Sequence, residues 1–485
     1  MKHYEELTGG EGKRVFYRAE RFKASVLMRD SAPQLNFRDD SFEIFDLSMS
    51  GLSFVSSSKT TWDEGDGQDL PITLNLGAEE IFQGKARIRR VEPLNNRQKV
   101  ALELTEGFLN ISDLLEKHDE ISLRKTLNSE MENISTLVPA EYKELIADAV
   151  FLLKSAKSTL EKIEAEMPVD FPRRDERIRE SILLCEQMAF ERWQEFYKIG
   201  NKVIKEIRDD EAVVAATKRY TESTLLPELM TGQNWHRSYT KPLGYPGDFQ
   251  IMNFFYSLSL SGDTAYSKFC HQLGNSTGRF ISVRMNMVKQ AIARLATEAA
   301  ARGKSSFEVA NLGCGPAQEV SNYLKTEKLP LPVSFTLIDQ DHDALSCAYE
   351  NSFPEVSRLK GQAKVSCLNA SFIEFLSAGK LFSKLGKQDL IYTVGLVDYL
   401  SPHRAKRFMT DLYANLNPGG TAIIGNMRET ESSLEWVLDY VTDWKLEYRT
   451  DAEMMAMADN LPDAKKEVVA DSTGHCHLLI VTKPE

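Results

Sequence analysis

The sequence predicts a multidomain protein with an amino-terminal antiparallel β-barrel, a helical connector and a carboxyl-terminal α/β domain with a mostly parallel sheet. Three observations predict this order. Residues 13–110 form short alternating runs separated by Gly, Asp and Asn turns, residues 111–300 repeat apolar side chains every three or four positions, and from about residue 305 strand-type and helix-type segments alternate. At 485 residues the chain is long enough for several such domains.

Six strand-type runs in the first part predict a small antiparallel sheet. Their roughly even spacing is typical of a closed barrel or a sandwich. The runs read FKASVLM, SFEIFDLS, GLSFVSS, LPITLNL, IFQGKARIRRVE and QKVALELTE. We expect this domain to cover residues 13–110.

The middle of the chain has the pattern of long helices. Strand-forming residues are sparse there, and Pro168 and Pro172 should end one helix before another begins near Asp175. We divide this part into a helical connector over residues 111–235 and a helical cap with a substrate loop over residues 236–304.

The last part alternates strands with helices. The strand-type segments are FEVANL, FTLID, KVSCL, DLIYTV, TAIIG and CHLLIVTK. This alternation predicts a mostly parallel sheet with helices on both faces, and we expect it over residues 305–485.

Composition narrows the class of protein. The chain has 59 basic and 71 acidic residues, a net charge of −12, and 42% apolar residues, which excludes wholesale disorder and argues against a long nucleic-acid-binding surface. We identify no secretory signal, no run of about 20 apolar residues and no C-x-x-C pair among the six cysteines. We therefore expect a cytoplasmic protein with reduced cysteines and no membrane span.

The strongest chemical signal follows the first strand of the α/β domain. Gly313 and Gly315 lie in NLGCGPAQE, where a turn without Cβ atoms lets the backbone approach a nucleotide-like ligand. Asp339 ends the second strand 26 residues after Gly313, close to the spacing at which a carboxylate binds ribose hydroxyls. The third glycine of the dinucleotide fingerprint is Ala317 or Gln318 here, and no phosphate-binding lysine follows, so NAD and ATP fit less well.

This segment resembles the first motif of class I S-adenosylmethionine-dependent methyltransferases, and the resemblance covers about residues 305–485. It implies a Rossmann-like domain with a seven-stranded sheet, closed by a final hairpin of residues 444–448 and 476–482. The resemblance further implies that Asp339 binds the ribose of the cofactor. It assigns the methionine half to the turn of Gly313, Cys314 and Gly315, and the adenine to Asn369, Ala370 and Ser371.

The fourth strand should end at the ligand crevice. Gly395, Asp398 and Tyr399 follow it in TVGLVDYL, at the edge of the sheet where cofactor and acceptor should meet. Asp398 and Tyr399 either position the acceptor or simply start a helix and pack. His403 is the nearest candidate base, or a helix residue that faces solvent.

A second unusual segment lies between the helices. Residues 239–253, YTKPLGYPGDFQIMN, resemble a loop of bacterial methyltransferases assigned to 3-hydroxypalmitic acid methyl ester biosynthesis, over about residues 220–485. The resemblance implies an acyl carboxylate as methyl acceptor. Lys241, Tyr245 and Asp248 could close over the cofactor, with His236 and Arg237 as base or carboxylate clamp. The alternative is a rigid turn between domains.

The barrel carries a signature of its own. RVFYR at residues 14–18 and DLSMSG at residues 46–51 resemble the two motifs of a PilZ domain, the bacterial receptor module for cyclic di-GMP. The two arginines that we expect to bind the phosphates of cyclic di-GMP are Arg14 with Arg18, or Arg18 with Arg21. The other expected ligand residues are Asp46, Ser48 and Gly51. The alternative is a purely structural barrel.

The sequence thus predicts a cyclic di-GMP-responsive methyltransferase that uses S-adenosylmethionine to O-methylate a fatty or hydroxy-fatty acid carboxylate. Two alternatives stay open: a non-catalytic regulatory protein that binds both ligands and acts through a protein partner, and a small-molecule N-methyltransferase. A homodimer through the helical connector is also left open. We expect no catalytic metal, because His475 and His477 lack a third ligand.

Overall fold

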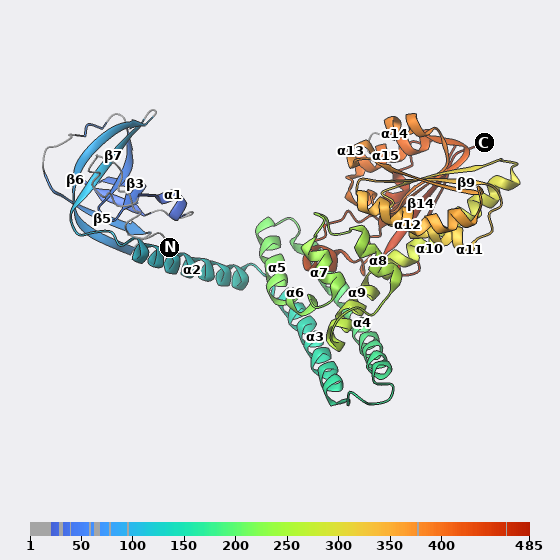
Figure 1. Cartoon of the computed structure of the whole chain (residues 1–485), viewed down its shortest axis with the longest axis horizontal. Helices are drawn as coiled ribbons and strands as arrows, with labels where there is room; N and C mark the ends of the chain where they lie inside the picture. Colours follow the sequence, from blue (N-terminus) through green and yellow to red (C-terminus); the bar gives the residue numbers. More distant parts are fainter. Residues whose placement is uncertain are drawn as a thin grey trace, which may run out of the picture. The chain divides into compact units, whose positions relative to one another are not determined.

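The computed structural model describes residues 21–28, 33–38, 40–57, 60–62, 68–76, 79–94, 97–375, 378–461 and 463–485, and the chain divides into two compact units, residues 1–133 and 134–485 (Figure 1). Arg14 and Arg18 lie outside the described residues. No helix in the described ranges is long and apolar enough to cross a membrane.

The first unit is a closed antiparallel barrel. Its strands are β1 (Phe22–Lys23), β2 (Gln34–Phe37), β3 (Asp40–Ser48), β4 (Gly51–Ser57), β5 (Leu70–Leu76), β6 (Glu79–Leu94) and β7 (Arg97–Glu106). The order is β1-β3-β2-β5-β6-β7-β4, and a further pairing of β3 with β4 closes six strands into the barrel. The predicted barrel is therefore confirmed.

One predicted strand of the barrel is wrong. FKASVLM forms only the two-residue β1 and then the short helix α1 (Ala24–Leu27), and the sixth barrel strand is instead β2, which the sequence pattern missed. Ala24 and Met28 are buried while Val26 is 68% exposed. Burial of residues 24 and 28 fits a helical turn as well as a strand. A strand would place Val26 on the same buried face as these two residues, so its exposure identifies the helix.

Helices fill the sequence between the barrel and the second sheet. They are α2 (Ile111–Thr136), α3 (Ala140–Glu166), α4 (Arg174–Ile207), α5 (Glu211–Thr224), α6 (Leu226–Leu229), α7 (Gln233–Thr240), α8 (Phe249–Ser257), α9 (Ala265–Thr277) and α10 (Arg279–Ala301). The break between α3 and α4 contains Pro168 and Pro172, as predicted. Helices α3, α4 and α6 to α9 contribute buried residues to one core, which includes Trp193 and Trp436, and α5 packs against it.

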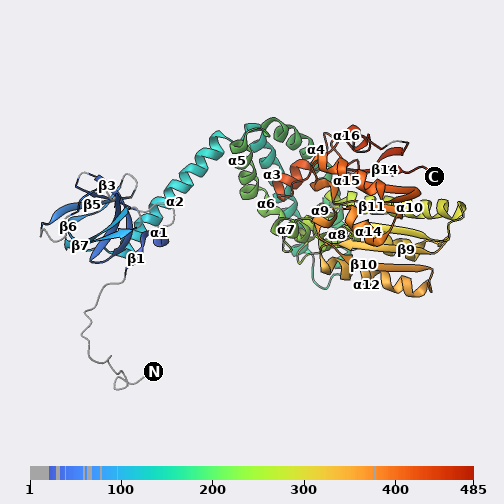
Figure 2. The ribbon, with the colours of Figure 1, turned by 90° about the horizontal axis from the view of Figure 1, so that it is seen from above.

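The second unit contains a mixed sheet of seven strands (Figure 2). The strands are β8 (Phe307–Leu312), β9 (Val333–Asp339), β10 (Ala363–Asn369), β11 (Gln388–Thr393), β12 (Leu416–Met427), β13 (Lys465–Ala470) and β14 (Cys476–Thr482). Their order is β10-β9-β8-β11-β12-β14-β13, in which β14 runs antiparallel to both neighbours. The predicted Rossmann-like architecture is confirmed.

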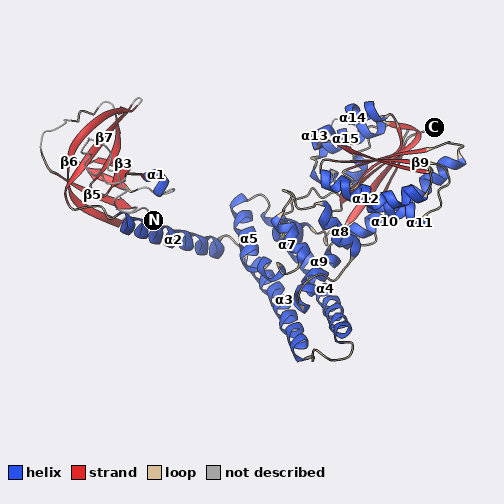
Figure 3. Cartoon of the chain, viewed as in Figure 1, coloured by secondary structure: helices blue, strands red, loops and turns tan. Residues whose placement is uncertain are grey.

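Helices cover both faces of this sheet (Figure 3). One face packs against α10, α11 (Gln318–Thr326) and α12 (His342–Arg358), and the other against α14 (Ala378–Leu385), α15 (Pro402–Ala414) and α16 (Asp451–Ala456). The short helix α13 (Phe372–Phe375) follows β10, a single 3₁₀ turn, Val397–Tyr399, follows β11, and a π-helical segment spans Trp436–Val441. The carboxyl ends of the central strands are thereby left for the site.

The predicted partner of β14 is wrong. Residues 444–448 form no strand, and the edge strand is β13. The alternation of Trp444, Leu446 and Tyr448 is real, but Trp444 and Leu446 line a cavity and Tyr448 packs on the helical core. Strand β13 contains no fully buried residue, so its sequence lacks the apolar signal that marks the central strands.

Candidate functional site

The turn after β8 forms the floor of the candidate site. Gly313 has φ of 66° and Gly315 has φ of 52°, a left-handed backbone that favours glycine. The backbone N–H of Gly313 donates to the carbonyl of Ile338 at 2.8 Å, which fastens the turn to the end of β9. A Cβ atom on Gly315 would meet nothing within 4 Å, and one on Gly313 would meet only Leu396 at 4.0 Å. The turn therefore presents bare backbone to open space.

Asp339 stands beside this turn at the end of β9. Its Oδ2 accepts from the backbone N–H of Gly315 at 2.8 Å, and its Oδ1 accepts from that of Asp341 at 3.0 Å. Burial raises the pKa of the Asp339 carboxyl, and these two N–H groups oppose the rise. Each oxygen keeps a further lone pair for a ligand hydroxyl.

A cavity of about 300 Å³ opens above the turn at the carboxyl ends of β8, β9 and β11. That volume is at the lower end of the range of small-molecule sites. Eight of the residues that the sequence nominated line it: Tyr245, Gly313, Cys314, Gly315, Asp339, Gly395, Asp398 and Tyr399. The predicted turn, ribose carboxylate and fourth-strand loop thus meet at one place.

Four nominated residues of the α/β domain do not line the cavity. The side-chain amide of Asn369 donates to the carbonyls of Asp339 and Gln340, at 3.2 and 3.0 Å, and ties β10 to β9. Ser371 is exposed and bonds Glu374, Ala370 is buried, and His403 is exposed in the first turn of α15. Phe372, which the sequence analysis did not nominate, is the neighbour that reaches the cavity.

Asp398 is a buried carboxylate in the cavity wall. Its Oδ1 accepts from the backbone N–H of Met427 at 2.7 Å, which joins the loop after β11 to the end of β12. Burial raises the pKa of the Asp398 carboxyl to about 6, although the charge of Arg284 and the Met427 N–H lower it. Such a carboxylate can hold a ligand or take a proton near neutral pH.

An Asp398→Asn variant should change how stability depends on pH. The amide oxygen can still accept from Met427, but the variant has no acid at this position. Wild-type Asp398 titrates near 6 when folded and near 3.8 in its ordinary state, so its favourable contribution is complete below pH 3.8 and lost as pH rises through 6. As pH rises from 3.8 to above 6, we therefore expect the free energy of unfolding of the variant to increase by about 3 kcal/mol relative to that of wild type.

Urea titrations of both proteins from pH 4 to pH 8 measure this gain. An Asp343→Asn variant is the control, because Asp343 is an exposed carboxyl. A difference between Asp398→Asn and wild type that stays constant with pH would contradict the assignment.

Tyr399 and Trp444 form one side of the cavity. The indole N–H of Trp444 donates to the hydroxyl of Tyr399 at 2.9 Å. Burial raises the pKa of the Tyr399 hydroxyl to about 12, so the group is neutral at physiological pH. The pair supplies a mainly apolar wall with one neutral polar group.

The loop of residues 241–248 closes another side. Tyr245 lines the cavity and donates its hydroxyl to Asp341 Oδ2 at 3.0 Å. Lys241 donates to the carbonyl of Asp443 at 2.8 Å. Arg237 pairs with the buried Asp248 at 2.7 Å, and Asp248 also caps α8. Lys241, Arg237 and Asp248 therefore fix the loop, whereas Tyr245 faces the ligand space.

The helices also contribute residues that the sequence analysis did not nominate. Phe280 and Arg284 on α10, Tyr256 after the middle of α8, and Glu319 on α11 all line the cavity. Glu319 is buried and accepts from Asn311 and Tyr392, at 3.0 and 2.8 Å. A sequence signal for such residues was available: a charged residue at the spacing of the apolar side chains of a helix, as Arg284 stands between Ile281 and Val288 on α10.

The barrel motif is built into the barrel wall. Asp46 is buried and pairs with Arg21 at 2.8 Å and Lys99 at 2.6 Å. Burial raises the pKa of the Asp46 carboxyl, but the Lys99 hydrogen bond leaves it below its usual range. The hydroxyl of Ser48 donates to the carbonyl of Gly51, where a Cβ would come within 2.4 Å of the Leu102 carbonyl oxygen. Arg21 keeps a side chain that is 41% exposed.

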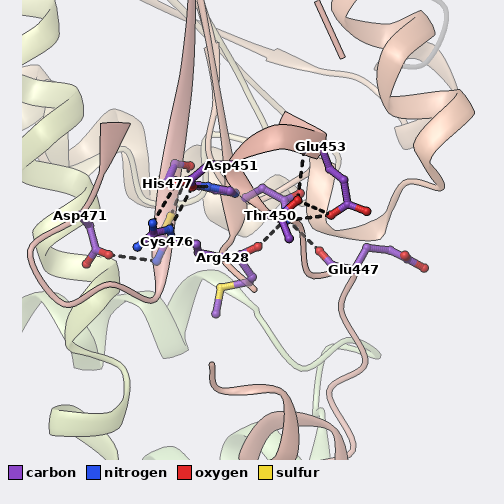
Figure 4. Close-up of polar contacts among 10 residues, drawn as sticks. Arg428, Glu447, Thr450, Asp451, Glu453, Asp471, Cys476 and His477 are labelled. Atoms are coloured by element: carbon purple, nitrogen blue, oxygen red, sulfur yellow. Dashed lines mark hydrogen bonds and ion pairs between the residues drawn. The ribbon is translucent and has the colours of Figure 1, made fainter. Parts of the chain in front are cut away.

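A separate polar cluster surrounds the start of β14 (Figure 4). Asp451 accepts from Arg428 at 2.9 and 2.7 Å and lies 2.8 Å from Nδ1 of His477. Burial lowers the pKa of both His475 and His477. Within the part of the chain that the structure describes, no group of three or more metal-ligating side chains could hold a metal ion.

No protein-family model and no curated protein matches the sequence. Among solved structures, a possible exported protein from Bordetella parapertussis is 18% identical over 52% of this chain and 86% of its own, with a TM-score of 0.39. Magnesium protoporphyrin IX methyltransferase from Synechocystis, with bound S-adenosylhomocysteine, is 13% identical over 52% of this chain and 100% of its own, at 0.34. The N-methyltransferase NodS from Bradyrhizobium japonicum is 15% identical over 41% of this chain and 87% of its own, with a TM-score of 0.29.

Proposed function

We propose that the chain is an S-adenosylmethionine-dependent methyltransferase that acts in the cytoplasm, with its cofactor site in the cavity above β8 and β9. One observation carries the proposal. The glycine turn leaves open space above bare backbone, and Asp339, which that turn fixes, lies beside it in the same cavity. A nucleoside with a charged amino-acid tail fits this combination of close backbone approach and a hydroxyl-binding carboxylate.

The residues present have distinct tasks in this proposal. Gly313, Cys314 and Gly315 bind the methionine half, and Asp339 binds the ribose hydroxyls. The adenine would lie beside the segment after β10, where Phe372 lines the cavity and the neighbouring Asn369, Ala370 and Ser371 do not. The bound cofactor supplies an already activated methyl group, so the protein must align the acceptor and exclude water. Tyr245, Tyr399 and Trp444 exclude water from the site.

The acceptor we propose is the carboxylate of a fatty or hydroxy-fatty acid. A carboxylate is ionised at neutral pH and needs no base to react with the methyl group. None of the described residues that line the cavity is a histidine or a lysine. The apolar side chains of Phe280, Ile281 and Trp444 offer a surface for an acyl chain.

One observation favours a second candidate, transfer to an amine or hydroxyl. Asp398, with a pKa of about 6, could take the proton that such an acceptor must lose. The two candidates predict opposite results for Asp398→Asn once cofactor binding has been shown to be intact. Carboxylate methylation should continue within about tenfold of wild type, whereas base-dependent methylation should fall by about 100-fold or more.

Product formation tests the enzymatic claim directly. We would incubate the full chain with methyl-labelled S-adenosylmethionine and a bacterial lipid extract, and identify labelled products by chromatography and mass spectrometry. A base-labile methyl ester is the expected product. Binding of the cofactor without any labelled product in lipid or small-molecule extracts would favour the non-catalytic regulatory protein.

We propose further that the barrel is a cyclic di-GMP receptor that regulates the transferase. The support is Arg21, an accessible guanidinium next to Asp46 on the barrel wall, since such a group can grip a phosphate and stack on a guanine. The helices over residues 111–235 are the proposed transmitting element. Regulation requires cyclic di-GMP to bind two states of the chain with different affinity.

Calorimetric titration with cyclic di-GMP tests this receptor. We expect saturable binding that falls at least tenfold in Arg21→Ala, because a charged hydrogen bond contributes about 1.5 to 3 kcal/mol. Arg89→Ala is the matched control, an exposed barrel arginine paired with Glu103. Absence of binding in wild type would identify a structural barrel, and saturating nucleotide without effect on cofactor affinity or turnover would contradict the regulation.

A further inference from the structure

The cavity contains a buried positive charge that the proposed cofactor contacts do not use. Arg284 projects from α10, is 7% exposed and lines the cavity. Its Nη2 lies 4.0 Å from the point where a Cβ on Gly395 would stand, at the end of β11. No carboxylate of the described residues lies within ion-pair distance of it. Burial lowers the pKa of the Arg284 guanidinium, but the Cys476 thiol, the Asp398 carboxyl and the Tyr256 hydroxyl outweigh burial and raise it.

The other cations of this region already have partners. Arg237 pairs with Asp248, and Lys241 pairs with Asp443. Arg449 is buried and donates to backbone carbonyls, among them that of Val397 at 3.2 Å. Among the described residues that line the cavity, Arg284 is the only one with a positively charged side chain.

A buried guanidinium is costly unless a hydrogen-bonded anion compensates it. Its five N–H groups form a planar fork that matches a carboxylate through two parallel hydrogen bonds. Arg284 also lies over the Phe280 ring at 5.7 Å, which limits how it can turn. The position is therefore suited to an anion that arrives with the ligand.

An apolar pocket adjoins the cavity on the same side. It has a volume of about 30 Å³, and Phe255, Leu434 and Leu438 are among its lining residues. Phe280, Ile281 and Trp444 line both spaces. A ligand whose charged end meets Arg284 thus finds an apolar wall next to it.

We propose that Arg284 binds the carboxylate of the methyl acceptor and that Phe280, Ile281 and Trp444 receive the apolar carbon attached to it. The inference rests on the proposed function for the reaction, but the recognition it describes can be measured without turnover. The same guanidinium chemistry would suit the amino-acid carboxylate of the cofactor. The apolar wall beside Arg284 favours the acceptor, because the amino-acid end of the cofactor is polar.

The test compares octanoate with 1-octanol, which has the same chain length but no charge. Both are titrated into wild type and Arg284→Gln in the presence of saturating S-adenosylhomocysteine, which already supplies the cofactor's own carboxylate. We expect wild type to bind octanoate about 10- to 100-fold more tightly than octanol, and Arg284→Gln to lose that preference. Arg284→Lys should keep part of it.

Controls separate recognition from folding and from cofactor binding. Arg294→Gln changes an exposed arginine of the same helix and should bind like wild type. Thermal unfolding shows whether each variant is folded, and the octanol affinity shows whether the apolar wall is intact.

Three results would overturn the inference. The first is a wild type that shows no preference for octanoate, and the second is an Arg284→Gln variant that retains the preference. The third is an Arg284→Gln variant that loses affinity for S-adenosylmethionine but binds 5′-methylthioadenosine normally. The last would assign Arg284 to the cofactor's carboxylate. A wild type that binds no S-adenosylhomocysteine contradicts the proposed function instead, and the octanoate titration without it still tests Arg284.

Discussion

A Gly315→Val variant is expected to bind S-adenosylmethionine at least 100-fold more weakly than wild type while still folding. The Cβ position of Gly315 opens into the cavity and meets nothing within 4 Å, so a valine side chain would occupy space that the cofactor needs. A 100-fold loss corresponds to about 2.7 kcal/mol. The φ of 52° adds backbone strain for valine of about 1 to 2 kcal/mol, which should lower the melting temperature by only a few degrees.

Gly361→Val is the matched control for strain. Gly361 also has a positive φ, 85°, and open space at its Cβ position, but it lies in the turn before β10 and does not line the cavity. Its variant should show a similar loss of melting temperature and wild-type affinity. Equal losses of affinity in the two variants would mean that strain, rather than the occupied cavity, weakens binding.

Asp339→Ala is expected to weaken S-adenosylmethionine binding by about 100-fold or more. The variant loses the carboxylate that we assign to the ribose hydroxyls, each such hydrogen bond to a charged group contributing about 1.5 to 3 kcal/mol. It also releases the N–H of Gly315, which Asp339 Oδ2 holds at 2.8 Å, so the turn itself loses an anchor. Asp339→Asn can still accept one hydrogen bond, so its affinity for S-adenosylmethionine should lie between those of wild type and Asp339→Ala.

The control for Asp339→Ala is Asp343→Ala. Asp343 is an exposed carboxyl four residues later, in the first turn of α12. Calorimetry on the two variants at equal concentration should find binding in Asp343→Ala alone. Wild-type affinity in Asp339→Ala would remove this carboxylate from the proposed site.

The sequence contained the centre of the candidate site because its signal is local. Gly313 and Gly315 follow an apolar strand and precede a helix, and Asp339 ends the next strand, so a parallel arrangement of the two strands suffices to bring them together. The same reasoning placed Gly395, Asp398 and Tyr399 at the crevice. Chain order and strand ends predict such residues well.

Residues on the surrounding helices could not be predicted in this way. The helical pattern shows that Arg284 shares an apolar face with Ile281 and Val288, but it does not reveal that the packing of α10 on the sheet brings Arg284 to the cavity. Conversely, Lys241, Arg237 and Asp248 looked like ligand residues, but each finds its partner within the protein. Partner choice depends on tertiary packing, so isolated charges in a loop remain ambiguous until their neighbours are known.

The prediction of strands was least accurate for short strands and at the edge of a sheet. The runs FKASVLM and 444–448 have the alternation of strands, yet the first becomes mainly a helix and the second an extended cavity wall. Strands β2 and β13 were missed because one is four residues long and the other is a partly exposed edge. Central strands, buried on both faces, were all recognised by their continuous apolar sequence.

Calorimetric titration of the full-length wild-type protein with S-adenosylmethionine tests the central claim most directly. The account predicts saturable binding at one site per chain, with a dissociation constant below about 1 mM. It also predicts that Asp339→Ala weakens this binding by about 100-fold or more and that Asp343→Ala preserves it. No saturable binding to folded wild-type protein, or wild-type affinity in Asp339→Ala, would contradict a cofactor site at this cavity.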